Sequence, residues 1–403
     1  MDNPFNKPVN TEFNAQIKNL VTVNPIIPET AEDREAETMA CLKILLTLKS
    51  RYAVMRQLIM AFGSGREVIR HKDNLRESIP EISDRLVDLM HRVEESAPRA
   101  DVEYEYIKAK KISAYTYYDV RYPSRLRECS DAPIILFYLG SADLNASKVL
   151  SIVGTRHITE YGRLLCDRFV AELAALVPDL LVISGLAYGV DVQSHRACLL
   201  DGLNTVGVFA HGLDRVYPSV HRKVASQMIS QGGLLTDFVT GTRPDRYNFV
   251  SRNRIVAGMA DGVLVVESAT KGGSLITADL ANGYDREVFA FPGRVGDLYS
   301  EGCNELIRDN KAICLTSAQE LVKQMNWESD DSIKNKPIQR ELFPGLSDDE
   351  RSVVTMLQQA GPLNADSMTV SLNIPVNQLQ TILFNLEIKG VVSVRPGSLY
   401  SLL

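Results

Sequence analysis

Four glycine-rich turns between residues 151 and 321 each follow an apolar, strand-like stretch. They span residues 153–156, 184–189, 210–214 and 271–274. A strand followed by a glycine turn and a helix directs backbone N–H groups and the positive end of the helix toward phosphate. Four such turns along one parallel sheet would form a long phosphate-binding rim. Such a rim suits a polymer such as nucleic acid better than one small cofactor.

The first turn, Gly154-Thr155-Arg156, combines three residue types that suit phosphate. The glycine permits a tight turn, the threonine hydroxyl can bond a phosphate oxygen, and the arginine can clamp a phosphate with two hydrogen bonds. Arg163 follows Gly162 at the start of the next helical stretch and would add a second cation. An ordinary strand-to-helix turn with an exposed arginine explains this motif equally well.

The second turn places two glycines, Gly185 and Gly189, around a short loop after Ser184. The loop enters a helix that contains His195, and Asp191 is a candidate for the N-cap of that helix. A catalytic role for His195 is less favoured than a structural one, because no serine or cysteine is arranged as its partner.

The third turn, with Gly212, leads to Arg215 and Tyr217 and then to a basic stretch at residues 221–223. Cations beside an aromatic ring suit single-stranded nucleic acid, since the cations follow phosphates while a base stacks on the ring. The alternative is a proline-terminated loop before an amphipathic helix with a solvated basic face.

The densest group of cations and aromatic rings lies at residues 248–254, before a helix expected at 255–259. Phe249, Arg252, Asn253 and Arg254 together fit phosphate contacts combined with polar contacts to a base or sugar. The rival interpretation is a buried arginine network, because Glu267 and Asp237 could pair with these arginines. Both hold if one arginine is structural while the other faces the ligand.

The fourth turn, Lys271-Gly272-Gly273-Ser274, precedes a helix expected at 275–284 and resembles half of a phosphate loop. The full Gly-x-x-x-x-Gly-Lys-[Ser/Thr] motif is absent, as is Gly-x-Gly-x-x-Gly. We therefore predict neither nucleotide hydrolysis nor dinucleotide chemistry. No catalytic residue, metal site or cofactor is expected.

The elements that must position these turns are strands and helices in alternation. Apolar strand candidates lie at residues 149–153, 180–184, 204–209, 233–236, 262–267, 287–291 and 312–314. Helical patterns separate most of them. Continuous Val/Ile/Leu runs alternating with helices predict an α/β fold with a doubly wound, mostly parallel sheet.

The chain divides into five predicted regions: a loose arm at 1–30, a small helical domain at 31–97, the sheet domain at 98–324, a linker at 325–345 and a winged-helix domain at 346–403. The last region contains three short helices followed by a hairpin. Its second and third helices contain only Lys389 as a cation, which makes them poor readers of a duplex groove. We interpret it as a protein-interaction or oligomerisation module.

Composition sets broad limits. The 403 residues carry a net charge of −6, so binding to DNA would need a local basic stripe. No apolar run is long enough to cross a bilayer, and the first residues do not show the pattern of a secretion signal, so no membrane partner is expected. The six cysteines show no CxxC pair or metal-ligand spacing. They fit reduced thiols in a cytoplasmic protein.

Taken in order, these motifs resemble those of the bacterial DNA-processing protein A (DprA/Smf) family. Each motif is weak alone, whereas the ordered set, which covers about residues 115–323, is highly specific. It comprises residues 122–126, 151–156, 184–191 with His195, 212–214 with Tyr217-Pro218, Phe249, 252–254, 273–274 with Thr277-Ala278, 291–293 and 302–307.

The resemblance implies an extended Rossmann-like domain that binds single-stranded DNA, usually as a homodimer. Family members protect incoming DNA during natural transformation and load the RecA recombinase onto it, without enzymatic activity or a nucleotide cofactor. Arg156 and the Tyr217 loop would then contact the strand. The full set expected to line the groove is Gly154, Thr155, Arg156, Arg163, Ser184, Gly185, Gly189, Gly212, Arg215, Tyr217, Phe249, Arg252, Asn253, Arg254, Lys271, Gly272, Gly273 and Ser274.

The chain departs from the family pattern at three places. Thr236-Asp237 stands where Ser-Glu is usual, and residues 209–212 replace a more common pair of glycines. The helical domain, which is SAM- or helix-hairpin-helix-like, has residues 48–52 where a DNA-binding hairpin would place Gly-x-Gly. The sequence Gly63-Ser64-Gly65 comes one helix later and fits an ordinary helix end, so we assign no DNA contacts to this domain.

A second function class is a lysine-decarboxylase-like nucleotide or phosphoribosyl hydrolase, which shares the glycine pair at residues 272–273. The signature of that class requires an acid soon after the turn to act on the sugar. Here the nearest following acid is Asp279, and the spacing is broken. A test for base released from nucleoside monophosphates separates the two classes.

Overall fold

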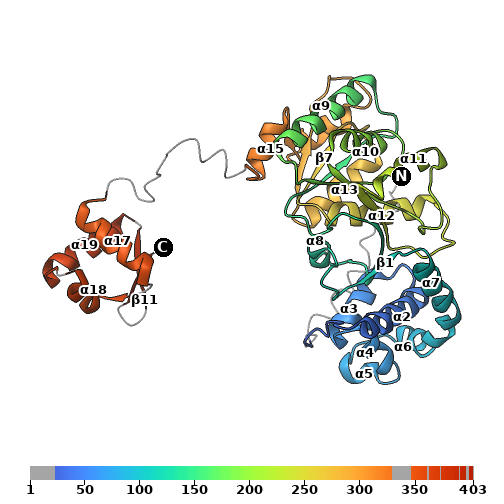
Figure 1. Ribbon diagram of the computed structural model, residues 1–403, viewed down its shortest axis with the longest axis horizontal. Coiled ribbons are helices and arrows are strands. Elements are labelled where there is room, and N and C mark those ends of the chain that lie inside the picture. Colours follow the sequence, from blue (N-terminus) through green and yellow to red (C-terminus); the bar gives the residue numbers. More distant parts are fainter. Residues whose placement is uncertain are drawn as a thin grey trace. The chain divides into compact units, whose positions relative to one another are not determined.

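The computed structural model describes residues 23–328, 346–360, 363–372, 374–389, 391–395 and 399–402. Most of the predicted arm and most of the predicted linker therefore lie outside the described residues. The chain forms two compact units, Met1–Glu328 and Ser329–Leu403, which we describe separately (Figure 1). The division falls within the linker predicted at residues 325–345.

The first unit is built around a nine-stranded sheet with the order β1-β2-β6-β5-β4-β3-β7-β8-β9. Every pairing from β6 to β9 is parallel, whereas β2 is antiparallel to both β1 and β6. This arrangement confirms the predicted α/β fold with a mostly parallel sheet. The strands are β1 Ser113–Thr116, β2 Ile135–Gly140, β3 Val149–Val153, β4 Leu181–Ser184, β5 Asn204–Val208, β6 Gly232–Thr236, β7 Gly262–Val265, β8 Glu287–Ala290 and β9 Ile313–Cys314.

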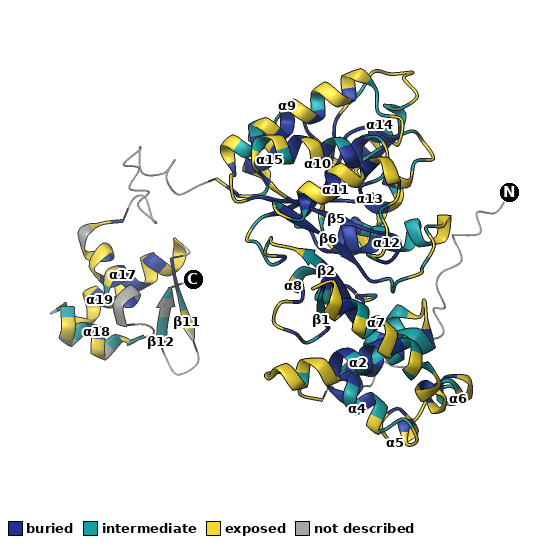
Figure 2. Ribbon diagram, turned by 45° about the vertical axis from the view of Figure 1, so that its right-hand side comes forward, coloured by how far each residue is buried: buried dark blue, intermediate teal, exposed yellow. Residues whose placement is uncertain are grey.

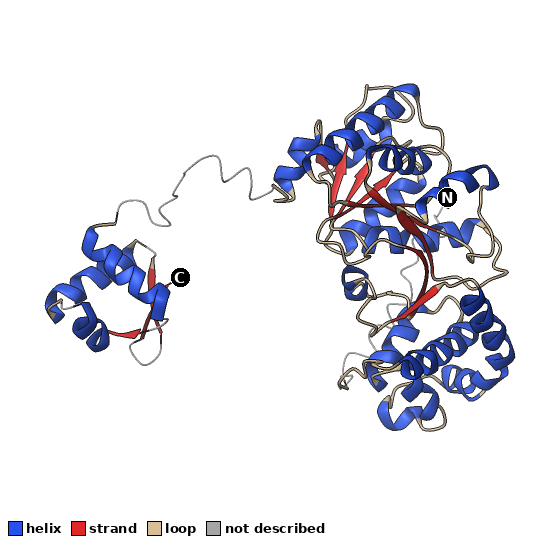
Figure 3. Ribbon diagram, viewed as in Figure 1, coloured by secondary structure: helices blue, strands red, loops and turns tan. Residues whose placement is uncertain are grey.

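Helices cover both faces of the sheet (Figure 3). Alternate residues of β3 show why its sequence is apolar throughout: Leu150 and Ile152 belong to the core beneath α9, whereas Val149 and Val153 belong to the core beneath α12. Figure 2 shows the buried sheet between helices whose outer surfaces are exposed. The helices are α8 Ser124–Glu128, α9 Glu160–Leu176, α10 Val190–Asp201, η2 Ser219–His221, α11 Arg222–Met228, α12 Arg246–Gly258, α13 Gly273–Gly283, α14 Glu301–Arg308 and α15 Ala318–Gln324.

Two features of this unit differ from expectation. The antiparallel strands β1 and β2 were not predicted, because no helix separates β2 from β3 and the expected alternation of strands and helices does not mark this segment. Helix α12 begins at Arg246 rather than near residue 255. Its N-cap is Asp245, whose carboxylate accepts a hydrogen bond from the Asn248 N–H at 2.8 Å. The cluster at residues 248–254 therefore lies inside a helix.

The N-terminal helices share one apolar core with the sheet through β1 and β2. Figure 1 shows α2, α3 and α7 next to β1. Gly63 ends α3 in the left-handed conformation, with φ of 79°, which is the ordinary helix end expected from the sequence. The helices are α2 Ala31–Leu48, α3 Tyr52–Phe62, α4 Gly65–Arg70, α5 Leu75–Ser78, α6 Asp84–His91, η1 Val93–Ser96 and α7 Ala97–Ala109.

The second unit has the predicted winged-helix arrangement of three helices and a terminal hairpin. A two-residue strand completes a small sheet with the order β10-β12-β11. The cation at the end of the third helix, Lys389, pairs with Glu350 at 2.7 Å. The elements are α17 Asp348–Ala360, β10 Leu363–Asn364, α18 Ala365–Leu372, α19 Val376–Ile388, β11 Val392–Arg395 and β12 Leu399–Leu402.

Candidate nucleic-acid interface

The four glycine turns lie together at one edge of the sheet. They follow β3, β4, β5 and β7, which are neighbouring, mutually parallel strands in the order β5-β4-β3-β7. Carboxyl ends of parallel strands meet at the same edge, which is where open α/β sheets bind ligands. We call this edge the rim and define it as residues 153–156, 184–189, 210–217 and 271–274.

The first two turns of the rim are in direct contact. The Thr155 carbonyl oxygen accepts a hydrogen bond from the Val190 N–H at 3.1 Å. Gly189 has φ of 79°, and a Cβ added there would lie 2.1 Å from that carbonyl oxygen. Only glycine fits this position. Gly154 is similarly crowded, since an added Cβ would lie 2.4 Å from the Val190 side chain.

Arg156 is exposed at the tip of the first turn. Glu267, considered above as a possible partner for arginine, is instead occupied by the Thr159 backbone N–H at 2.9 Å and the Thr159 hydroxyl at 2.5 Å. Within residues 23–328, Arg156 has no acidic partner. Its guanidinium is therefore available to an external anion.

Phe249 is the centre of a group of cations and aromatic rings above the rim. The guanidinium carbon of Arg156 lies 5.0 Å from the centroid of its ring. The ring of Tyr217, which is 47% exposed, lies 5.9 Å from it. A free cation beside two aromatic rings can hold a phosphate while a base stacks on the ring surface.

Arg252, by contrast, is only 3% exposed, and its guanidinium donates a hydrogen bond to the Val208 carbonyl oxygen. Burial lowers the pKa of Arg252 to about 10, although nearby Asp191 favours its charge. It therefore remains protonated at neutral pH. A Cβ at Gly185 would lie 2.0 Å from the Arg252 guanidinium. The second turn thus needs glycine to make room for this arginine.

Arg254 is 4% exposed and forms a salt bridge with Asp237. It also donates to the Asp131 carbonyl oxygen at 2.5 Å. Burial disfavours the charge of this side chain, yet Asp237 and Asp131 raise the pKa of Arg254 above its ordinary value. Both guanidinium groups, for which direct DNA contacts were predicted, face the interior. The buried-network interpretation describes them.

Asn253 and the fourth turn complete this side of the rim. The Asn253 side-chain amide donates to the Gly273 carbonyl oxygen at 3.4 Å and so connects α12 to that turn. Lys271 is exposed, and Gly272 is the N-cap of α13. The Ser274 hydroxyl is buried and donates to the Ser268 hydroxyl at 2.8 Å, so it serves the fold.

The remaining predicted site residues divide between surface and interior. Arg163 is exposed on α9, and Arg215 is exposed but pairs with Asp214 at 2.7 Å. Ser184 is buried and donates to the Ile152 carbonyl oxygen at 2.6 Å. Thr155 and Gly212 are also buried. The hydroxyl of Thr155 accepts from the His157 N–H at 3.1 Å, and an added Cβ at Gly212 would lie 2.6 Å from the Val239 carbonyl oxygen.

His195 is fully buried on α10, and its Nδ1 lies 2.7 Å from the Thr205 hydroxyl oxygen. Burial, together with the charge of Arg252, lowers the pKa of His195 to about 3. The ring therefore stays neutral. Asp191, expected to cap this helix, lies in its first turn instead, and Gly189 occupies the N-cap. The Asp191 carboxylate accepts from the Ala187 N–H at 3.4 Å.

Sequence reasoning missed a basic and aromatic stretch where α12 begins. Arg243, Arg246 and Tyr247 are exposed, and neither arginine has an acidic partner in the described part of the chain. Arg246 lies about one helical turn before Phe249. This proximity was not apparent because the helix was expected to begin later.

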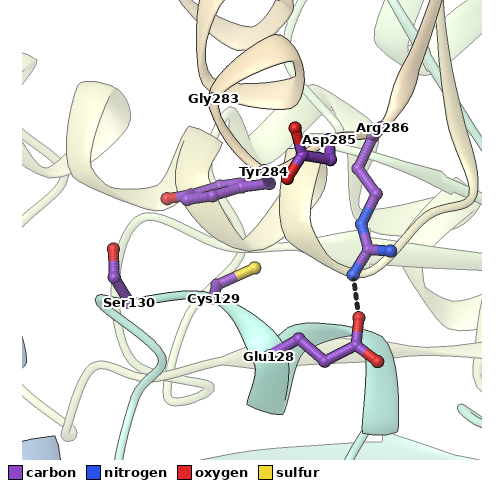
Figure 4. Close-up of a pocket in the computed structure, with 7 residues that line it drawn as sticks. All are labelled: Glu128, Cys129, Ser130, Gly283, Tyr284, Asp285 and Arg286. Atoms are coloured by element: carbon purple, nitrogen blue, oxygen red, sulfur yellow. Dashed lines mark hydrogen bonds and ion pairs between the residues drawn. The ribbon is translucent and has the colours of Figure 1, made fainter.

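Figure 4 shows a pocket that includes no residue of the rim. It is formed where α8 ends and where α13 leads into the amino end of β8. One wall carries the ion pair between Arg286 and Glu128, at 2.8 Å. The pocket is lined by Glu128, Cys129, Ser130, Gly283, Tyr284, Asp285 and Arg286. It shares no lining residue with the rim.

Two further searches concern the described residues only. None of their helices is both long and apolar enough to cross a membrane. None of their His, Cys, Asp and Glu side chains form a group of three or more that could hold a metal ion.

Comparison with known proteins places these features in a family. Residues 113–326 match the family DNA recombination-mediator protein A, and residues 340–398 match the DprA winged helix domain. DNA processing protein DprA of Streptococcus pneumoniae is 34% identical over 218 residues, which cover 54% of this chain and 76% of that protein. Protein Smf of Escherichia coli is 33% identical over 294 residues, which cover 68% of this chain and 74% of that protein.

A solved structure extends the likeness to the fold. The X-ray structure of DprA from Streptococcus pneumoniae superposes with a TM-score of 0.57 at 28% sequence identity, covering 73% of this chain and 98% of that one. The family match covers the whole rim and the segment that carries Phe249. The chain therefore belongs to the DNA recombination-mediator protein A (DprA/Smf) family.

Proposed function

We propose that the rim binds single-stranded DNA and that the protein is a recombination mediator, which protects incoming DNA and loads RecA onto it during natural transformation. The observation that carries this proposal is Arg156, unpaired at the rim and stacked over Phe249 beside Tyr217. Four adjacent strands span about 14 Å. At 3.4 Å per stacked nucleotide this length matches roughly four nucleotides.

An unpaired strand fits this surface better than a duplex. Phosphates can approach Arg156 and Lys271, which lack acidic partners within residues 23–328. Tyr217 and Phe249 offer ring faces for stacking, and a duplex hides the faces of its bases inside its own stack. We therefore expect single strands to bind more tightly than duplexes of the same length.

Titration of labelled single- and double-stranded oligonucleotides at two salt concentrations tests the proposal. We expect Arg156→Ala to weaken single-strand binding about tenfold or more and to reduce the salt slope by roughly one contact, because a charge-assisted phosphate bond is lost. Arg85→Ala is the matched control, since Arg85 is exposed on α6 and has no acidic partner within residues 23–328. Equal binding by all three proteins would contradict the assignment of the rim.

Two further parts of the proposal rest on family membership rather than on the geometry of the rim. We propose that the protein acts as a homodimer and that RecA is its recombinase partner. Sedimentation of the protein should give twice the chain mass. RecA-dependent ATP hydrolysis on single strands should begin sooner when the protein is present, and an unchanged lag would argue against loading.

The proposed role is non-enzymatic. The hydrolase alternative needs Asp279 near the fourth turn, but this residue lies about two helical turns into α13. Its carboxylate accepts from Lys311 at 3.0 Å, near the start of β9. Incubation with nucleoside monophosphates should release no base. Release that disappears in Asp279→Ala would favour the hydrolase instead.

A further inference from the structure

The N-terminal helices contact the segment that runs from the end of β6 through α12. We call residues 237–258 the α12 segment; it carries Phe249 and Arg252. The helices of residues 31–109 contact it through side chains at two separate places, one on α3 and one on α7. These helices lack the Gly-x-Gly of a DNA-binding hairpin, so the sequence predicts no DNA contacts for them.

The first contact is between Tyr52, the first residue of α3, and Arg254. The guanidinium carbon of Arg254 lies 3.8 Å from the centroid of the Tyr52 ring. The same guanidinium forms the salt bridge with Asp237 and donates a hydrogen bond to the backbone carbonyl oxygen of Asp131. A desolvated cation against an aromatic face is a strong contact of its kind. Tyr52 therefore ties α3 to the buried end of the Arg254 side chain.

The second contact is between α7 and Thr240. Glu103, which is 2% exposed, accepts hydrogen bonds from the Thr240 N–H at 2.9 Å and from its hydroxyl at 2.5 Å. Arg99 donates to the Thr240 carbonyl oxygen at 2.7 Å. Helix α7 thus binds the N–H, the hydroxyl and the carbonyl oxygen of Thr240.

Both contacts lead directly to the aromatic group at the rim. Phe249 lies five residues before Arg254 on α12, about 7.5 Å along a rigid helix. Gly241, next to Thr240, donates its N–H to the Asp214 carboxylate at 3.3 Å, in the loop that carries Tyr217. Movement of either anchor would therefore shift the ring faces of Phe249 and Tyr217.

We infer that the N-terminal helices position the single-strand interface, with Tyr52 and Glu103 acting as positioning residues that hold α12 and its preceding loop. This inference rests on the proposed DNA-binding function and adds to it a role for the N-terminal helices. Neither residue lies in the rim, so neither is expected to touch the strand.

Tyr52→Leu tests the first contact, because it keeps apolar bulk while removing the aromatic face. We expect the affinity for a single-stranded oligonucleotide to fall roughly 5- to 20-fold, as when displaced rings weaken one base–aromatic stacking contact. Tyr52→Phe keeps the ring but loses the hydroxyl, which also interacts with Ser251 and Arg254, so it should retain most of the binding. Hydrogen exchange of the amides at residues 249–254 should accelerate in Tyr52→Leu without DNA present.

Tyr104→Leu is the matched control, since Tyr104 on α7 also lies against a cation, Lys108, at 5.2 Å. It should change neither DNA affinity nor exchange in α12. Thr240→Val tests the second contact independently if Tyr52→Leu fails to fold. Unchanged exchange at residues 249–254 in the folded variants would overturn the inference. Absence of single-strand binding by the wild-type protein would instead overturn the proposed function. Hydrogen exchange would then still decide whether the helices hold α12.

Discussion

Arg156 and Arg254 belong to two neighbouring regions of the molecule that use the same side chain in opposite ways. Arg156 follows a glycine turn at the tip of a loop, where it is exposed and forms no ion pair within residues 23–328. Arg254 lies within α12, where Asp237, Asp131 and Tyr52 enclose it. The comparison shows that a cation-rich motif does not by itself tell which of its cations face solvent and which are buried.

The largest expected difference between the Arg254 and Arg156 regions is in how much a substitution there changes the stability of the protein. Arg254→Ala should lower the free energy of unfolding by about 3–5 kcal/mol, because Asp237 would be left as an unpaired buried charge. Arg156→Ala should change it by no more than about 0.5 kcal/mol. Denaturant unfolding measures both. Similar stabilities for the two variants would break the comparison.

Two glycines of the rim extend the comparison between buried and exposed positions. Gly185→Ala should cost up to about 3 kcal/mol of stability, because the new Cβ would overlap the Arg252 guanidinium. Gly273→Ala meets nothing within 4 Å and lies at the start of α13, so it should leave stability unchanged or slightly higher. Thermal unfolding distinguishes them. The same Gly273→Ala should weaken single-strand binding, since its methyl group would stand where a phosphate approaches the turn.

A smaller effect concerns pH. His195 has a folded pKa of about 3, below the ordinary value of 6.5, so the unfolded chain binds more protons between these values. Its contribution to stability is present above pH 6.5 and is lost as the pH falls toward 3. As the pH falls from 7 to 5, the neutral state of this ring should lower the free energy of unfolding by about 2 kcal/mol. Unfolding of His195→Gln should be less pH-dependent over that range, and an equal dependence would show that the ring is not held neutral.

Much of the fold was predictable because local signals were strong. The buried parallel strands β3, β4, β5 and β7 are continuous apolar runs, and glycine marks the turn after each. The winged-helix pattern was read from helical periodicity and a terminal hairpin. β2 is also a continuous apolar run that ends at Gly140, but no helix separates it from β3, so the alternation of strands and helices did not mark it. It joins the sheet with β1 as an antiparallel pair.

The candidate site was predictable in place but only partly in detail. Arg156, Tyr217 and Phe249 do come together above the rim. Arg246 was missed because the start of α12 was placed too late. The roles of Tyr52 and Glu103 could not be predicted, since their partners lie more than a hundred residues away in the chain.

By itself the sequence determined which segments form the buried parallel strands, where glycine must turn the chain and which family the motifs resemble. These properties depend on hydrophobic periodicity and on backbone conformations that only glycine readily adopts. The tertiary structure alone decided that β5, β4, β3 and β7 are neighbours, and that Arg254 turns inward while Arg156 turns outward. Whether an arginine is buried depends on the acids and rings that distant segments bring to it, and no local pattern contains that information.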